Sequence, residues 1–293
     1  MHFKNYIQSI IKNLSQNLRV ATNEIISALI EAGRTISYVE TVSNKADTLH
    51  RHIKNTDEKT LKKAFEFNTR KSLRRMGLGK VMLAIDTTDE LYYGKNGKLN
   101  VRRKKYEKGT DTAFSYIVLS IVSPKSLPLM ALPYKQGQDK STLCKELLEY
   151  AKSLLINIQC ILFDRGFYIG ALINYLSSVN LKYLIFVPQN EAMKKYISKT
   201  NSLASFVHEI KWNKNFTWWK TQTKIVIIKS QFFNQKKKQM EDCFWCFATN
   251  LKQSLYLISK YKQRWQIETD FRVHDEARIK SKSNEPIIRY FYF

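Results

Sequence analysis

Two short apolar runs, each followed by an aspartate, constrain the fold of this chain more than any other feature. The runs are VMLAID at residues 81–86 and IQCILFD at residues 158–164. Runs of this length, with little polar alternation, are typical of strands that are buried on both faces of a sheet. Such a sheet needs helices on both sides. The runs therefore predict an α/β fold in which Asp86 and Asp164 lie at strand ends.

The first 78 residues carry a helical pattern. Apolar residues recur at intervals of three and four over residues 6–14, 23–32 and 59–67, and Gly33 is a plausible end for the second of these helices. A small helical domain rich in Lys and Arg, over residues 1–78, suits the recognition of DNA ends. A helical cap with a solvated charged face is an equally good interpretation of the same pattern.

The rest of the chain, residues 79–293, predicts a mixed sheet flanked by helices. Two β-rich runs, residues 113–122 and 127–134, are separated by a Ser-Pro turn and predict a hairpin. Residues 191–242 do not continue the alternation of strand and helix patterns seen before them. The remaining patterns predict strands at residues 181–187 and 243–249 and helices at residues 143–155, 167–179 and 254–277.

The chain carries a large excess of positive charge. Its 49 Lys and Arg residues against 25 Asp and Glu residues give a formal net charge of +24, which points to a polyanionic partner, with nucleic acid the leading candidate. Apolar residues make up 44% of the chain, which excludes a disordered protein. The longest apolar stretches are shorter than the roughly 20 residues of a membrane span. We recognise no signal peptide and expect a cytoplasmic protein without a membrane partner.

The sequence lacks the patterns of two other kinds of site. Four Cys residues are too sparse for a disulfide scaffold, and the lone pair Cys243 and Cys246 lacks the second ligand pair of a structural zinc site. We therefore expect free thiols. The chain has no Gly-rich phosphate-binding loop, which argues against nucleotide hydrolysis.

Three acidic residues are candidates for a metal site. Asp86 and Asp164 follow the two apolar runs, at the place where open α/β sheets bind ligands. Glu268 lies within the expected helix at residues 254–277, on a face that its apolar neighbours predict to be partly buried. A buried carboxylate needs a partner, and three oxygen ligands suit Mg²⁺ or Mn²⁺. Two such ions, about 3.5–4 Å apart, are able to clamp both oxygens of a phosphodiester during displacement.

Each of these acids alone is weak evidence, because acids often occur where strands end and loops begin. Asp89 and Glu90 follow Asp86 closely and are expected to be solvated. Periodicity does not decide between Asp86 and Asp89 as the metal ligand. The apolar run that leads into Asp86 favours Asp86.

Several basic and aromatic residues are candidates for contacts to DNA. The basic run at residues 95–108 suits a phosphate backbone, or equally a solvated loop. Within residues 211–240, the Trp residues suit base stacking, although core aromatics of a small β-sheet are the more common explanation. The arginine after the second aspartate suits a DNA phosphate or a nearby acid. The candidates are Arg102, Arg103, Lys104, Lys105, Arg165, Trp218 and Trp219.

The residues Tyr261, Arg264 and Glu268 form a Tyr-x2-Arg-x3-Glu pattern. This pattern resembles the signature of the large group of DDE transposases from bacterial and archaeal insertion sequences that is written Y-R-E-K. The blocks AIDTTDELYYG and LFDRGFYIGALINYL look like the first-aspartate and second-aspartate blocks of that group. The resemblance covers roughly residues 80–293. Three ordered blocks with compatible spacing make a specific signal.

The resemblance implies an RNase H-like fold with a β-rich insertion that includes residues 191–242. It implies that Asp86, Asp164 and Glu268 bind two metal ions, Mg²⁺ or Mn²⁺, and are the catalytic residues. The implied reaction is cleavage of DNA at the ends of the element, followed by strand transfer into target DNA. Tyr261 and Arg264 would contact double-stranded DNA near the cut. A homodimer on paired ends, located with the nucleoid, is expected on the same ground.

The chain departs from the pattern of the group in two places. The family Lys falls on Asp275, which weakens the assignment to this branch. The aromatic ending at residues 290–293 raises the expectation of a C-terminally truncated copy. An inactive or host-adopted DNA-binding protein derived from a transposase is therefore an alternative. Another RNase H-fold nuclease without strand transfer is a further alternative.

Overall fold

The computed structural model describes residues 22–35, 37–44, 46–94, 101–214, 216–277 and 279–293. The helix expected at residues 6–14 and the first part of the basic run, residues 95–100, lie outside the described residues. Among the described helices, none is both long enough and apolar enough to cross a membrane.

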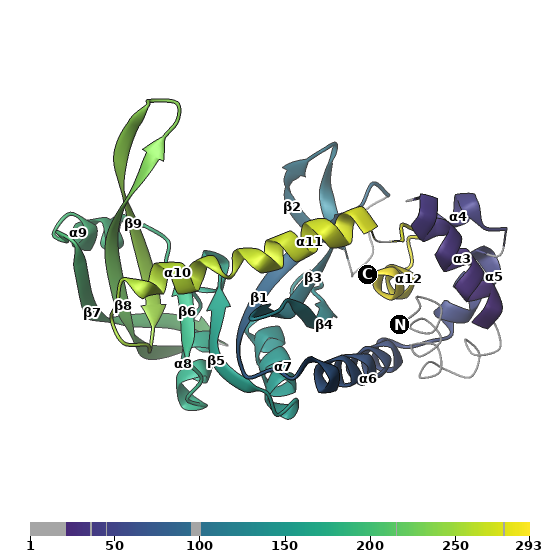
Figure 1. The fold of residues 1–293 in the computed structure, drawn as a ribbon, viewed down its shortest axis with the longest axis horizontal. Helices are drawn as coiled ribbons and strands as arrows, with labels where there is room; N and C mark the ends of the chain where they lie inside the picture. The colour runs from purple at the N-terminus through teal and green to yellow at the C-terminus, as the bar shows by residue number, and fades with distance from the viewer. Residues whose placement is uncertain (1–21, 36, 45, 95–100, 215, 278) are drawn as a thin grey trace.

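Nine strands of the described residues form one mixed sheet, in the order β2-β3-β1-β5-β6-β9-β8-β7, with β4 paired to β3 (Figure 1). The three strands β1, β5 and β6 run parallel to one another, and the other pairings are antiparallel. This mixed α/β architecture, compatible with an RNase H-like fold, confirms the expected class. The strands are β1 (Lys80–Leu91), β2 (Val101–Glu107), β3 (Thr110–Ser123), β4 (Leu127–Pro133), β5 (Asn157–Phe163), β6 (Tyr183–Phe186), β7 (Leu203–Lys214), β8 (Thr217–Asn234) and β9 (Gln239–Thr249).

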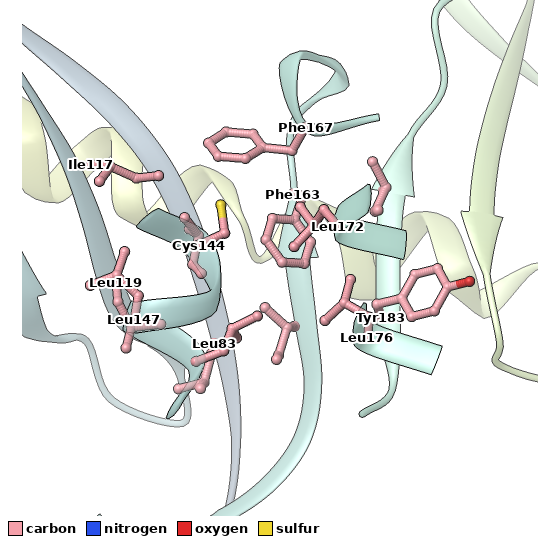
Figure 2. Packing of buried hydrophobic residues seen from close by; sticks show 14 of the residues in the cluster. Leu83, Ile117, Leu119, Cys144, Leu147, Phe163, Phe167, Leu172, Leu176 and Tyr183 are labelled. Atoms are coloured by element: carbon pink, nitrogen blue, oxygen red, sulfur yellow. The ribbon is translucent and has the colours of Figure 1, made fainter. Parts of the chain in front are cut away.

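Helices cover both faces of the central strands, which is why these strands are apolar without alternation. Leu83 and Phe163 belong to the core under α7 (Lys140–Ser153) and α8 (Gly170–Ser178), which Figure 2 shows from close by. Ala84 and Leu162 belong to the core on the other face, under α10 (Tyr256–Lys262) and α11 (Trp265–Ala277). The two faces alternate residue by residue along β1, as the strand period of two requires.

A group of helices stands beside the sheet and shares its core with the last helix of the chain (Figure 1). Ile288 and Tyr292 of α12 are buried among residues of the N-terminal helices. The predicted domain boundary after residue 78 stays a prediction, and these contacts cross it. The helices are α3 (Thr22–Thr35), α4 (Val39–Val42), α5 (Ala46–Lys54), α6 (Glu58–Met76) and α12 (Pro286–Tyr292), while α9 (Glu191–Ile197) lies on the far side, before β7.

Local signals explain where several helices begin and end. The Asp57 carboxylate accepts a hydrogen bond from the Thr60 N–H at 2.6 Å and begins α6, and Gly77, with φ of +54°, ends it in the left-handed conformation that glycine favours. Gly33 does not end α3, which continues to Thr35. The preceding Ala32 is fully buried against the helical group, so packing extends the helix past the glycine.

Two expectations for the second half of the chain need correction. The helix expected at residues 254–277 is two helices, because the backbone at Gln263 and Arg264 makes i→i−3 hydrogen bonds that tighten the chain between them. The β-rich insertion that the resemblance implies includes residues 203–234. These residues form β7 and β8, which extend the central sheet beyond β9. The strand expected at residues 243–249 is longer and begins at Gln239.

Candidate active site

Asp86 and Asp164 are neighbours because of the register between β1 and β5. The parallel pairing places Ile85 opposite Phe163, so each aspartate directly follows a paired residue. At this point β5 ends, whereas β1 continues to Leu91 along β3. The expected end of the first strand at Asp86 is therefore wrong. Asp86 lies instead directly after the last residue of β1 that pairs with β5, at a point where β1 still pairs with β3.

Arg264 connects Asp86 to Glu268. Its Nη1 donates a hydrogen bond to Asp86 Oδ2 at 2.6 Å, and its Nη2 donates to Glu268 Oε1 at 2.5 Å. The arginine side chain is only 7% exposed and lies at the junction of α10 and α11. One guanidinium thus joins the strand acid to the helix acid across the face of the sheet that α10 and α11 cover.

The contacts of the Asp86 carboxylate offset only part of the cost of burying its negative charge. Burial raises the pKa of Asp86 from its usual value of 3.8 to about 6, against the opposing attraction of Arg264. The Thr87 N–H, which donates to Asp86 Oδ1 at 2.8 Å, also opposes this rise. Repulsion from Asp164 and Glu268 raises the pKa of Asp86 further. Asp164 and Glu268 therefore both lie near enough to Asp86 to affect its pKa.

Glu268 is not buried, contrary to the expectation. Its side chain is 54% exposed, and Trp265 is exposed as well. The residue of this turn that packs against the sheet is Ile267, which is fully buried. Successive helical residues are about 100° apart, so Glu268 points toward solvent while it keeps its i,i+4 contact with Arg264.

Tyr261 lies inside the core rather than on a surface open to DNA. Its ring packs with the rings of Phe186, Trp245 and Phe247, with centroids 5.1–6.2 Å apart, and burial raises the pKa of its hydroxyl to about 12. The Arg264 guanidinium carbon lies 5.6 Å from the centroid of the Tyr261 ring. In this arrangement, Tyr261 supports Arg264 from the core side.

The three acids have the donor chemistry of a site for a hard divalent cation, because carboxylate oxygens are the preferred ligands of such ions. Across the described part of the chain, no three His, Cys, Asp or Glu side chains are grouped closely enough to hold a metal ion. The cation that lies between Asp86 and Glu268 is the Arg264 guanidinium. The position between these two carboxylates thus accommodates positive charge.

The two acids that follow Asp86 on β1 have partners elsewhere. Asp89 accepts a hydrogen bond from the Ser115 hydroxyl at 2.5 Å and forms an ion pair with Lys104 at 3.2 Å. Glu90 is buried, contrary to the expectation that it is solvated, and forms an ion pair with Arg289 of α12 at 2.6 Å. Asp86 is the residue of this block that faces Arg264.

The predicted DNA contacts lie in different environments. Arg165 and Arg103 are exposed. Lys104 instead forms ion pairs with Asp89 and Glu107. The structure also places the exposed Lys105 on β2, an outer strand of the sheet, so this part of the basic run is not a loop.

Two tryptophans of β8 lie on the surface. Trp218 is 72% exposed and Trp219 is 53% exposed, near the turn between β7 and β8. The interpretation of these two residues as core aromatics is therefore wrong. Trp245 of β9, which lies outside residues 211–240, does pack against the Tyr261 cluster.

Sequence reasoning missed Lys140, the first residue of α7. Its pKa is lowered by burial and responds to the charges of Arg102, Asp86 and Asp164, so its ammonium group lies near the candidate acids. The signal that was available is the N-cap of α7. There the Asp139 carboxylate accepts hydrogen bonds from the N–H groups of Ser141 and Thr142. The periodicity of the helix begins three residues later and did not include this turn.

Comparison with known proteins identifies the family. A family model described as a transposase DDE domain matches residues 79–283. None of the curated proteins compared with the chain matches it. The matched segment contains Asp86, Asp164, Arg264 and Glu268, and it covers more than two thirds of the chain. The chain belongs to the family of transposase DDE domains.

Proposed function

We propose that this chain cuts DNA at the ends of an insertion sequence and joins the freed ends to target DNA, and that it is a member of the Y-R-E-K group. The observation that carries the proposal is the pair of bonds from Arg264 to Asp86 and Glu268. Together with the β1–β5 register, these bonds gather an acid from each of three sequence blocks at one edge of the sheet.

Asp86, Asp164 and Glu268 are the residues that would hold Mg²⁺ or Mn²⁺. When bound, such ions would lower the pKa of the attacking water or 3′-hydroxyl and stabilise the leaving oxygen. A divalent cation held by Asp86 and Glu268 would compete with Arg264 for these two carboxylates. Arg264 would then give up at least one of its two bonds and become available to a DNA phosphate, while the Tyr261 ring keeps it at the site.

The remaining contacts to DNA are proposed from charge and exposure. Arg102, Arg103 and Lys105 on β2, together with Arg165, would bind phosphates, and Trp218 and Trp219 would stack on bases. The helical residues 1–78 would recognise the element end. We expect two copies of the chain to act together on a pair of ends.

The proposal is tested with a plasmid that carries the DNA flanking the gene for this chain. The protein is incubated with this plasmid and Mg²⁺ or Mn²⁺, and the cut positions are mapped. Asp164→Asn is the test variant, and Asp242→Asn, an exposed acid of β9 that pairs with Lys229, is the matched control. Thermal melting with and without Mn²⁺ measures metal binding independently of cutting.

We expect metal-dependent cuts at the element ends with the wild-type chain and with Asp242→Asn, and none with Asp164→Asn. Mn²⁺ should raise the Tm of the wild type more than that of Asp164→Asn. Salt-sensitive DNA binding without any cutting would contradict the proposal and support the alternative of an inactive DNA-binding protein. Cutting that persists in Asp164→Asn would exclude Asp164 from the site.

A further inference from the structure

Two cationic side chains, Lys140 and Arg102, meet beside the candidate acids. The Arg102 guanidinium carbon lies 3.7 Å from the centroid of the Tyr134 ring, and Lys140 Nζ lies 5.9 Å from the same centroid. Lys140 Nζ also lies 4.4 Å from the centroid of the Phe167 ring and 3.4 Å from the Gly166 carbonyl oxygen. Gly166 and Phe167 belong to the turn that directly follows Asp164.

Neither cation has an acidic partner at ion-pair distance within the described residues. The carboxylate next to Lys140, that of Asp139, accepts hydrogen bonds from the N–H and hydroxyl groups of Ser141 and Thr142 instead. Asp86 forms its ion pair with Arg264. The Nε of Arg102 is buried and has no hydrogen-bond partner. Two like charges are thus held together while donors remain unused, and a buried donor without a partner is costly.

The missing partner is an anion. An aromatic ring lies against each cation, and Lys140 Nζ lies next to the turn after Asp164. A guanidinium and an ammonium that share one aromatic ring suit a phosphate group, which offers two free oxygens to separate donors. This pair also lies on the side of the sheet covered by α7, whereas Arg264 belongs to the side covered by α10 and α11.

We propose that Lys140 and Arg102 bind the phosphate group that is cut and hold it next to the turn that follows Asp164. The inference rests on the proposed function, and it adds a substrate-binding residue, Lys140, for which the sequence offered no motif. Lys140 supplies a fixed positive charge from α7, and Arg102 supplies two further donors from β2. The aromatic residues Tyr134 and Phe167 limit the directions in which the two cations are able to move.

The test measures binding of a DNA duplex, taken from the mapped element end, in EDTA and over a series of KCl concentrations. The variants are Lys140→Met, which keeps the aliphatic stem but removes the charge, Lys140→Arg, which restores it, and Arg102→Gln. The matched control is Lys145→Met, because Lys145 is on the same helix and also lies over an aromatic ring, that of Tyr175. A second duplex carries an uncharged methylphosphonate at the cut position.

We expect Lys140→Met and Arg102→Gln each to lower the slope of log K against log salt concentration by about 0.9 and to weaken binding about ten-fold. Lys140→Arg and Lys145→Met should bind as the wild type does. The methylphosphonate should weaken binding by the wild type by about the same factor and have little further effect on Lys140→Met, since the contact is already lost.

An unchanged salt slope for both Lys140→Met and Arg102→Gln, or an equal effect of the methylphosphonate on wild type and variants, would overturn the inference. Should Lys140→Met fail to fold, Arg102→Gln and the methylphosphonate on the wild type carry the same test. Failure of the proposed function has a different outcome: the wild type then makes no cut with metal. The salt slopes are in that case measured on a duplex from the DNA that flanks the gene, and unchanged slopes for both variants still overturn the inference.

Discussion

Arg264 Nη1 lies 2.6 Å from Asp86 Oδ2, and this contact joins two residues that are 178 positions apart in the chain. It connects the central strand β1 to the junction of α10 and α11. Arg264 is also the residue that reaches Glu268, so the arrangement of two of the three candidate acids depends on one buried side chain.

Arg264→Met should destabilise the protein by about 3–5 kcal/mol at neutral pH, because it leaves the Asp86 carboxylate buried without its cation. Urea unfolding measures the free energy. Arg165→Met is the control, since Arg165 is exposed and its loss should change the stability by no more than about 0.5 kcal/mol. Equal stabilities of the two variants would show that the ion pair is not formed.

Asp86→Asn should remove a loss of stability that the wild type shows as pH rises. The folded-state pKa of Asp86 is raised from 3.8 to about 6, so the folded protein holds the proton more tightly, and its stability falls as pH rises through this window. Asn resembles the protonated form, and the variant should avoid this loss of about 1–3 kcal/mol above pH 6. Unfolding at several pH values tests this.

The control for this pH dependence is Asp242→Asn. The hydrogen bond from Lys229 lowers the pKa of Asp242, so the stability that this carboxylate contributes is lost as pH falls rather than as it rises. The wild type and Asp242→Asn should therefore converge at low pH. If the free energy of unfolding varied with pH in the same way for the wild type and Asp86→Asn, the raised pKa assigned to the buried Asp86 would be contradicted.

Arg289→Met should destabilise the protein by about 3–5 kcal/mol, because Arg289 and Glu90 form an ion pair in which both side chains are at most 10% exposed. Adding Glu90→Leu to Arg289→Met should recover part of this loss, since an apolar pair replaces an isolated charge. Lys54→Met, which removes an exposed partner of Glu285 on the same helical group, should cost at most about 1 kcal/mol. A double variant no more stable than Arg289→Met would argue against the pair as the source of the effect.

Trp218→Ala and Trp219→Ala should leave the stability within about 0.5 kcal/mol of the wild type, because both side chains are largely exposed. The same variants should weaken binding of single-stranded or distorted DNA about ten-fold, if bases stack on these rings. Trp245→Ala, on the neighbouring strand, should instead lower the Tm, since Trp245 packs against Phe186, Phe247 and Tyr261. Anisotropy and thermal melting separate the two effects.

Much of the central sheet was predictable because its signal is local. The runs at residues 81–86 and 158–164 are apolar on both faces, and the structure buries both faces under different helices. The hairpin of β3 and β4 and the helix α7 follow equally from periodicity and turn residues. The break between α10 and α11 was not predictable, because every residue from 256 to 277 is compatible with one continuous helix.

The exposure of side chains was predicted less well. Glu268 was expected on a buried face because its neighbours Trp265 and Phe271 are aromatic, yet Ile267 is the residue that meets the sheet. Trp218 and Trp219 look like core residues in sequence, yet both side chains are more than half exposed near the turn between β7 and β8. Aromatic composition alone does not say which face of an element is covered.

The sequence by itself determined the class of fold and the apolar runs that form the buried parts of β1 and β5, because such a run is a pattern of adjacent residues. The tertiary structure alone decided what surrounds Asp86 and Asp164. Arg264 and Lys140 approach the acids from opposite faces of the sheet. Arg264 is 178 positions from Asp86, and Lys140 begins the helix that precedes β5. Such contacts depend on strand register and helix packing, which no local pattern contains.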